Sequence, residues 1–314
     1  MRKIERALVL GGAGFLGSWL VEHLDAEGIE PFVVDQAATD ASSSNAVHGD
    51  VRAVDLRSLL LDHRIDAIFH FATAAYVPPS VDNPLADLEQ NVATTIAVLE
   101  AARRSELRPM VVLASSAAVY GEGVRLPIDE EHPLEPVSPY GVSKLAAERY
   151  LRLYHRLYGL PSVAVRMFSL YGPRQRKQVV YDLLMRAHQG ESPLAVVGRP
   201  EVSRDLVFVG DAARAMLTLA RAAPGAAEAY NLASGQATTI GELATAIVEV
   251  MGLDTSLAFS GQVRPGDPLM WLGDPSKAAQ LGVTCPTPLL DGLRLTADWL
   301  VGSAAVSSPA RLAP

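Results

Sequence analysis

The chain has 314 residues, of which 49% are hydrophobic; this is enough for a sizeable core and argues against wholesale disorder. Its formal net charge of −8 argues against binding to nucleic acid or to an anionic membrane, because both need a basic face. Cys285 is the single cysteine, so no intrachain disulfide and no thiolate metal cluster can form. We therefore expect a cytoplasmic protein without a bound metal, and no apolar stretch approaches the roughly 18 residues of a membrane span.

The first half of the chain alternates short apolar runs with segments of helical periodicity. The apolar runs are continuous, which predicts strands of a parallel sheet that is covered on both faces. Crossover helices between such strands have one hand, so we expect a doubly wound α/β fold of the Rossmann type over residues 1–172. The predicted strands are residues 7–10, 32–35, 67–71, 110–116 and 162–167, and the longest predicted helices are 88–104 and 139–158.

The second half is less regular, because Gly172-Pro173 interrupts the alternation and proline and glycine become dense from residue 264 to 288. We interpret residues 173–300 as a smaller lobe that interleaves with the first domain, to which residues 206–236 return. Residues 301–314 are rich in alanine, serine and proline and are expected to form a disordered tail. The predicted elements here are helices over 179–189 and 240–251 and strands over 206–209 and 229–232.

A glycine-rich turn follows the first predicted strand and opens a helix. Glycines permit the tight turn and let backbone N–H groups approach a pyrophosphate, while the helix N-terminus adds its positive dipole end. Asp35 ends the next strand, where a carboxylate binds a ribose 2′-hydroxyl and repels a 2′-phosphate. This order of elements favours an NAD site over a purely structural turn. The residues assigned to the loop are Gly11, Gly14, Phe15, Leu16 and Gly17.

Two later segments extend the predicted cofactor site. Asp50, which precedes Val51, either accepts a hydrogen bond from the adenine amino group or is a turn residue, and the sequence leaves both interpretations open. Phe71, Ala72 and Ala74 follow the strand that ends near residue 71. The small side chains among them let a flat cofactor pass close to the end of the strand.

A candidate catalytic pair opens the helix predicted over residues 139–158. Tyr140 and Lys144 are four residues apart and share one face of that helix. A nearby ammonium lowers the pKa of a phenol, so such a tyrosine can act as a general base. Ser115 and Ser116 end a strand at the sheet edge where ligands bind, and Ser116 can share a hydrogen bond with a substrate hydroxyl. The alternatives are an ordinary exposed Tyr/Lys pair and turn-forming serines.

Together these motifs resemble those of the extended short-chain dehydrogenases/reductases, in particular the NAD-dependent nucleotide-sugar epimerases and dehydratases. The resemblance covers residues 7–300. It implies that Tyr140 is the base, that Lys144 orients the nicotinamide ribose and tunes Tyr140, and that Ser116 positions the sugar. The motifs that carry it are the glycine loop, Asp35, residues 70–75, Asn91, residues 115–121, Tyr140, Lys144, and residues 171–173, 204–209 and 264–267.

The resemblance also implies NAD as cofactor, with Asn91 and Ser115 beside it, and a nucleotide-diphosphate sugar as substrate. Arg204 and Arg264 are implied to hold the diphosphate, which suits the fork of a guanidinium, with Asp267 in the same substrate site. Family members are commonly homodimers, so the resemblance implies a homodimer paired through helices that here would include residues 88–104 and 139–158. One position departs from the family: Ser169 stands where an asparagine is usual. The basic cluster at residues 174–177 either compensates for this loss or is a solvated charged face.

The residues after Ser116 separate the reactions of this family. Related 4,6-dehydratases carry an Asp-Glu pair there, whereas Ala117 and Ala118 can neither donate nor accept a proton. We therefore expect NAD-dependent epimerisation of a nucleotide sugar, at C4 through a transient 4-keto sugar. The alternatives are a 4-ketoreductase or dehydratase acting on a similar sugar, and a cofactor-binding scaffold protein, against which Tyr140 and Lys144 argue.

Overall fold

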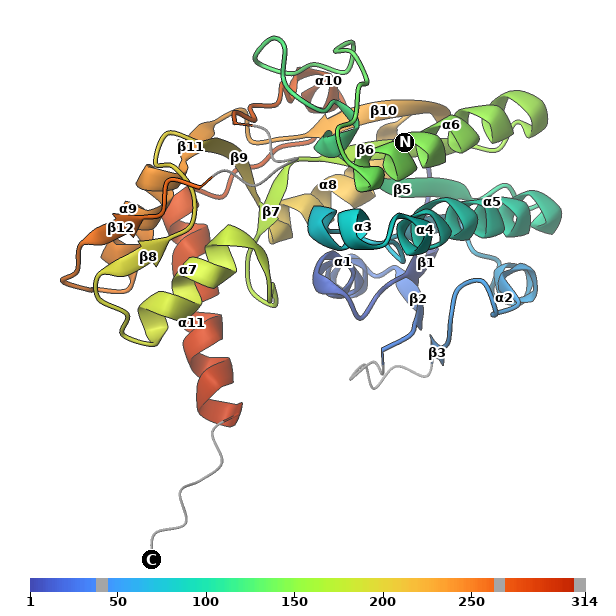
Figure 1. The fold of residues 1–314 in the computed structure, drawn as a ribbon. Coiled ribbons are helices and arrows are strands. Elements are labelled where there is room, and N and C mark those ends of the chain that lie inside the picture. The colour runs from blue at the N-terminus through green and yellow to red at the C-terminus, as the bar shows by residue number, and fades with distance from the viewer. Residues whose placement is uncertain (38–44, 263–268, 308–314) are drawn as a thin grey trace, which may run out of the picture.

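The computed structural model describes residues 1–37, 45–262 and 269–307, and a sheet of seven strands lies at the centre of these residues (Figure 1). All neighbouring strands run parallel, in the order β10-β6-β5-β4-β1-β2-β3. The order reverses beside β1, so the expected doubly wound α/β fold is confirmed. The strands are β1 (Arg6–Leu10), β2 (Glu30–Asp35), β3 (Ala46–His48), β4 (Ala67–His70), β5 (Met110–Ser116), β6 (Ser162–Met167) and β10 (Ala226–Leu232).

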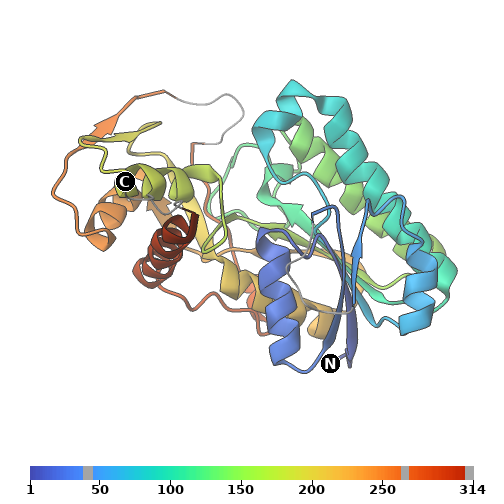
Figure 2. The ribbon, with the colours of Figure 1, turned by 90° about the horizontal axis from the view of Figure 1, so that it is seen from below.

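Helices cover both faces of this sheet. Successive side chains of each strand point to opposite faces, and both sets are apolar, so each face needs a covering layer. Along β1, Ala7 and Val9 join the core beneath α1 and α8, whereas Leu8 and Leu10 join the core beneath α2, α5 and α6. Figure 2 shows the two helical layers on opposite sides of the sheet. The helices are α1 (Phe15–Ala26), α2 (Leu56–His63), α5 (Thr94–Ser105), α6 (Pro139–Tyr158) and α8 (Val209–Ala222).

The helix expected over residues 88–104 is interrupted at its start. Following α3 (Val77–Asp82), the short α4 (Pro84–Leu88) runs into a π-helical turn (Glu89–Ala93), and α5 follows. In the wider turn Thr95 Oγ1 donates to the Asn91 carbonyl oxygen at 2.6 Å. Both α4 and the π-helical turn pack against α6, which places their buried side chains beside the helix that carries Tyr140 and Lys144.

The smaller lobe lies to the left of the large sheet in Figure 1. It contains a three-stranded sheet in the order β11-β9-β7, a two-stranded sheet of β12 and β8, and the helices that pack on them. Its elements are β7 (Ser169–Tyr171), α7 (Gln178–His188), β8 (Leu194–Val196), β9 (Ser203–Phe208), β11 (Ala237–Thr239), α9 (Ile240–Val250), β12 (Leu257–Phe259) and α11 (Leu289–Ser307), while the short α10 (Ser276–Ala279) packs against β10.

Two boundaries differ from expectation. Residues 206–236 return to the large sheet through α8 and β10, but β9 pairs with β7 and β11 in the smaller lobe. The tail predicted from residue 301 is wrong for residues 301–307, because α11 continues through Ser307; residues 308–314 lie outside the described part of the chain. No helix in the described residues is long and apolar enough to span a bilayer.

Candidate active site

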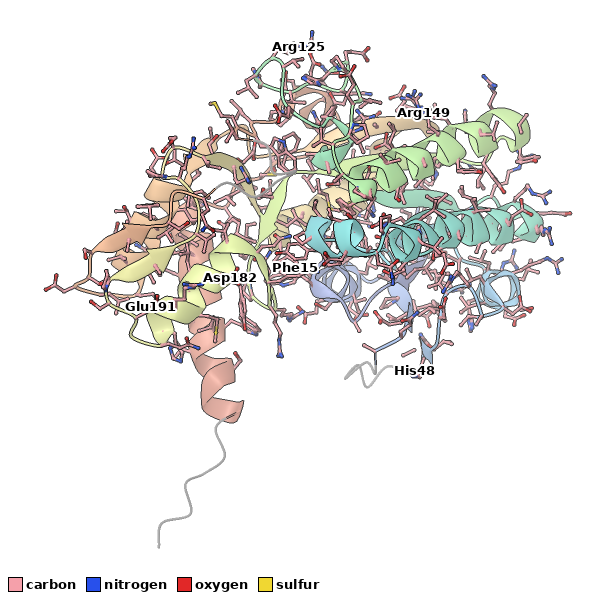
Figure 3. The ribbon with its side chains drawn as sticks, viewed as in Figure 1. Phe15, His48, Arg125, Arg149, Asp182 and Glu191 are labelled. Atoms are coloured by element: carbon pink, nitrogen blue, oxygen red, sulfur yellow. The ribbon has the colours of Figure 1, made fainter. Side chains whose placement is uncertain are left out.

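A cavity of about 540 Å³ lies between the carboxyl ends of the central strands and the smaller lobe. Phe15 of α1 and Asp182 of α7 line it from its two sides (Figure 3). This is the place where open α/β sheets bind ligands. Of the residues predicted from the sequence, the wall of the cavity brings together Gly11, Gly14, Phe15, Leu16, Gly17, Phe71, Ser115, Ser116, Tyr140, Lys144, Ser169 and Arg204.

The glycine loop keeps open a space that side chains would fill. Gly11 has a φ of 85°, in the left-handed region that favours glycine. A Cβ on Gly17 would lie 2.1 Å from the carbonyl oxygen of Gly11, so only glycine lets α1 begin so close to the turn. No side chain caps the N-terminus of α1, which leaves its first N–H groups for a ligand. The loop therefore fits the pyrophosphate of a dinucleotide such as NAD.

Two carboxylates near the loop have different surroundings. Asp35 ends β2, and its carboxylate accepts the N–H of Ala13 and the N–H of Ala37, each at 2.9 Å. Each of its oxygens keeps a second lone pair, so Asp35 can still bind ribose hydroxyls. Asp50 accepts both the backbone N–H of Arg52, at 2.8 Å, and its guanidinium, at 2.9 Å. These are the contacts of a turn residue, and the adenine contact of Asp50 stays a prediction.

Other predicted cofactor residues lie outside the wall of the cavity. Val51 is 4% exposed, and Ala72 packs against the same core. Ala74, two residues after Ala72, is half-buried. Asn91 is fully buried, and its Nδ2 donates to Asp87 Oδ1 at 3.0 Å. The structure thus gives Val51 and Asn91 places in the protein interior.

The predicted catalytic residues meet at one end of the cavity. Ser138 caps α6, since its Oγ accepts the N–H of Gly141 at 3.2 Å. The N–H of Tyr140 donates to Ser80 Oγ of α3 at 3.1 Å, which fixes the start of the helix. The Ser116 side chain, at the end of β5, is close enough to the Tyr140 phenol to lower its pKa. Ser116 and Tyr140 also line the same cavity.

Burial controls the acid–base properties of this pair. It raises the pKa of Tyr140 to about 12, and the hydrogen bond from Ser116 offsets only part of this rise. Desolvation of the phenolate therefore dominates the Tyr140 pKa in the protein without a cofactor, and the expected lowering by Lys144 stays a prediction. Burial likewise lowers the pKa of Lys144 to about 7, against the opposing effects of Asp87 and Glu148.

Lys144 is held by neutral oxygens. Its side chain is 2% exposed, and Nζ donates to Thr73 Oγ1 at 2.7 Å and to the Ala114 carbonyl oxygen at 2.9 Å. The same Nζ lies 5.6 Å from the centre of the Tyr140 ring. The predicted pair thus shares one buried face of α6.

The substrate side of the cavity belongs to the smaller lobe. Ser169 begins β7, and Arg204 on β9 places its guanidinium carbon 5.8 Å from the Trp271 ring centre. Of the basic cluster, Arg174 pairs with Glu22, whereas Arg176 and Lys177 line the cavity. Arg264 and Asp267 lie outside the described residues.

Sequence reasoning missed several residues of the wall. Thr73 lies in the predicted stretch after β4, but its contact with Lys144 needed the fold. Tyr76 faces Lys177, whose Nζ lies 5.3 Å from the ring centre. The other missed wall residues include Arg186 and Trp271, which no motif marked.

The fold and this site define a class: a doubly wound dinucleotide-binding enzyme with a serine, tyrosine and lysine set, as in the extended short-chain dehydrogenases/reductases. Residues 7–233 match the model of the NAD dependent epimerase/dehydratase family. This match covers more than half of the chain, which therefore belongs to that family.

Curated relatives and solved structures agree with the family. A putative UDP-glucose 4-epimerase of Methanocaldococcus jannaschii is 32% identical over 93% of this chain and 97% of its own length. The UDP-glucose 4-epimerase of Mycolicibacterium smegmatis is 34% identical over 79% and 83%. A UDP-N-acetylglucosamine 4-epimerase from Methanobrevibacter ruminantium, in complex with UDP-N-acetylmuramic acid, has a TM-score of 0.89 at 29% identity and covers 96% of this chain and 100% of its own. The NAD complex of the Thermus thermophilus UDP-glucose 4-epimerase has a TM-score of 0.85 at 32% identity, covering 95% and 99%.

Proposed function

We propose that this protein is an NAD-dependent 4-epimerase of UDP-sugars. The observation that carries the proposal is the buried set of Ser116, Tyr140 and Lys144 beside the glycine loop, in one cavity. The relatives named above act on UDP-glucose or UDP-N-acetylglucosamine, which supports a UDP-sugar as the substrate.

Each residue of the set has a distinct task. The Tyr140 phenolate accepts the proton of the sugar O4 and later returns it, while Ser116 holds the same oxygen through its hydroxyl. Lys144 orients the nicotinamide ribose and adds positive charge behind Tyr140. NAD, held by the glycine loop, would supply the reversible hydride acceptor for C4 and a positive charge that favours the phenolate. The glycine loop and Asp35 hold this cofactor.

On the substrate side, we assign the UDP diphosphate to Arg204, with Arg264 and Asp267 contributing from the segment between residues 262 and 269. Arg204 lies on the wall of the cavity, and a guanidinium matches phosphate oxygens in charge and geometry. Ser169 is assigned to the same site, and Arg176 and Lys177 supply further positive charge there. In this proposal residues 1–172 bind NAD and residues 173–300 bind the nucleotide sugar.

Epimerisation is favoured over dehydration by what stands beside Ser116. Ala117 and Ala118 are buried and offer no acid or base for elimination of water. The test supplies UDP-glucose and UDP-N-acetylglucosamine without added reductant and follows each by proton NMR. An inverted C4 hydroxyl with no net NADH consumed supports the proposal. Loss of water would indicate a dehydratase, and turnover only with stoichiometric NADH would indicate a ketoreductase. Either result would contradict the proposal.

Tyr140→Phe tests the assignment of the base. It should remove nearly all turnover and leave NAD affinity close to that of the wild type, because the ring still packs and only the proton acceptor is lost. Tyr150→Phe, an exposed position on the same helix, is the matched control and should retain wild-type kcat. A Tyr140→Phe protein with most of its kcat would remove Tyr140 from the mechanism.

We further propose a homodimer and a cytoplasmic location. Exposed apolar side chains on α4 and α6, including Leu88, Val142 and Leu157, support a subunit interface over these helices. The free Cys285 suits a reducing compartment. Analytical ultracentrifugation tests the dimer, and a monomer at micromolar concentration would contradict it.

A further inference from the structure

Four charged side chains are buried around α6, two of each sign. They are Asp87, Lys144, Glu148 and Arg166, each at most 4% exposed. Burying a charge is costly unless an opposite charge or strong hydrogen bonds compensate it. The contacts of these four residues show how the compensation is arranged.

Glu148 and Arg166 form a complete pair. Arg166 donates from Nε and NH2 to the two carboxylate oxygens of Glu148, at 3.0 and 2.7 Å. Ser115 Oγ donates to the same carboxylate at 2.5 Å, so the Ser115 hydroxyl is committed to Glu148. Arg166 Nη1 donates to the Tyr120 hydroxyl at 3.0 Å and to the Glu130 carbonyl oxygen at 3.4 Å.

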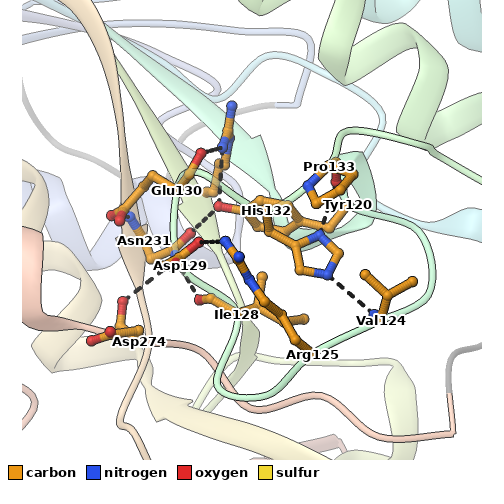
Figure 4. Close-up of polar contacts among 11 residues, drawn as sticks. Tyr120, Val124, Arg125, Ile128, Asp129, Glu130, His132, Pro133, Asn231 and Asp274 are labelled. Atoms are coloured by element: carbon orange, nitrogen blue, oxygen red, sulfur yellow. Dashed lines mark hydrogen bonds and ion pairs between the residues drawn. The ribbon is translucent and has the colours of Figure 1, made fainter.

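Tyr120 continues the network away from the active site. Its hydroxyl donates to Asn231 Oδ1 at 2.6 Å, and Asn231 is bound in turn by Glu130 and Ile128 of the loop before α6 (Figure 4). The negative charge of Glu148 is therefore neutralised at close range by Arg166. Glu148 has little charge left with which to balance Lys144, although it lies one turn further along α6.

Asp87 and Lys144 are the two charges that remain. Lys144 contacts only neutral oxygens, and it forms no ion pair within 4 Å among the described residues. Asp87 Oδ1 accepts Asn91 Nδ2, whereas its Oδ2 is buried and has no hydrogen-bond partner in the described part of the chain. Asp87 lies on α4, which packs directly against α6.

We propose that Asp87 is a positioning residue that acts through Lys144: it is the buried counter-charge that keeps Lys144 as an ammonium beside Tyr140. The geometry that supports this is a buried carboxylate with one unpartnered oxygen on α4, which packs against the helix that carries Lys144, while the other buried carboxylate beside α6 is already paired with Arg166. Charge compensation over a short distance needs no direct contact in a region of low dielectric.

The electrostatics of the neighbouring groups agree with this role. The charge of Asp87 raises the Lys144 pKa more than the charge of Glu148 does, and it also raises the Tyr140 pKa. His70 of β4 faces the same region but stays neutral, because burial, aided by Lys144, lowers its pKa to about 3. Removing the charge of Asp87 should therefore lower the pKa of both Lys144 and Tyr140.

Asp87→Asn is the first test, because the amide oxygen can still accept the hydrogen bond of Asn91. Catalysis needs Tyr140 deprotonated and Lys144 protonated, so the acid limb and the alkaline limb of the kcat profile should both move to lower pH. We expect shifts of about one unit, typical of the loss of a charge at short range. A merely structural defect would lower kcat at every pH and leave the limbs in place. Glu89→Gln, an exposed carboxylate in the next turn, is the matched control and should keep the wild-type profile.

A second measurement does not depend on turnover. The sequence contains only four lysines, Lys3, Lys144, Lys177 and Lys277, so lysine-selective ¹³C labelling gives four side-chain signals to titrate by NMR. Lys144 should titrate at lower pH in Asp87→Asn, while the other three lysines stay unchanged, and Asp87→Glu should restore the wild-type value. Asp87→Ser is a second neutral variant, should the amide prevent folding.

An unchanged Lys144 titration in the neutral variants, or limbs that stay in place, would overturn the proposal. The pH-profile measurement rests on the proposed epimerase activity, whereas the titration does not. Failure of that activity would therefore still leave the role of Asp87 open to a direct answer.

Discussion

Replacing Gly17 with alanine tests whether close approach of α1 to the glycine loop builds the cofactor site. The added Cβ would lie 2.1 Å from the Gly11 carbonyl oxygen and 2.8 Å from the Gly12 Cα. Carbon and oxygen atoms in contact are about 3.3 Å apart, so α1 would have to retreat by about 1 Å. Both neighbours are backbone atoms that cannot rotate away, and overpacking of this kind costs about 1–3 kcal/mol.

The retreat should weaken NAD binding, because the loop and the start of α1 must hold the pyrophosphate together. We expect an affinity loss of at least about tenfold, or 1.4 kcal/mol, by calorimetry on protein stripped of nucleotide. Gly302→Ala is the control, since its Cβ would meet nothing within 4 Å and it lies far from the loop in sequence. Equal NAD affinity of Gly17→Ala and the wild type would refute the idea that this approach shapes the site.

Three further predictions concern single side chains. NAD should bind at least about tenfold tighter than NADP, because Asp35 would meet a 2′-phosphate, and Asp35→Ser should narrow this ratio; equal dissociation constants for the wild type would contradict the assignment. Arg204→Ala should raise the KM for a UDP-sugar about tenfold or more and spare NAD affinity, since a charge-assisted contact contributes about 1.5–3 kcal/mol; an unchanged KM would mean that Arg204 does not reach the substrate. Gly302→Ala, at an exposed position of α11, should raise the free energy of unfolding in urea by up to about 1 kcal/mol, and a loss of stability would show that this end of the helix is not regular.

Much of the fold was predictable because the large sheet is buried on both faces. Its strands are continuous apolar runs, and the predicted bounds of β5 (Met110–Ser116), β6 (Ser162–Met167) and α6 (Pro139–Tyr158) agree with the structure. The π-helical turn at Glu89–Ala93 was not predicted, because π-helices are rare and occur mostly as single turns inside α-helices. The helix α11 (Leu289–Ser307) was not predicted, and residues 301–307 were assigned to a tail, since alanine and serine there are compatible with a helix as well as with a tail.

The site was predictable where backbone geometry demands a residue type. The glycines of the loop and the Tyr140 and Lys144 spacing belong to this group. The contact of Ser115 was not predictable, because the fold alone brings its partner Glu148 to it. The high pKa of Tyr140 was missed for a similar reason: sequence reveals the neighbouring lysine but not the depth of burial.

The chain passes repeatedly between its two lobes, and this limits how the protein can be re-engineered. It leaves the large sheet between Met167 and Ser169, returns where Phe208 ends β9 and α8 begins, and leaves again between β10 and β11. Near the C-terminus Lys277 comes back once more, and its Nζ donates to the Ala229 carbonyl oxygen of β10 at 2.9 Å. The smaller lobe is thus no contiguous cassette that could be grafted from a homologue. New substrate preferences are better sought by point substitutions in the wall of the cavity than by swapping modules.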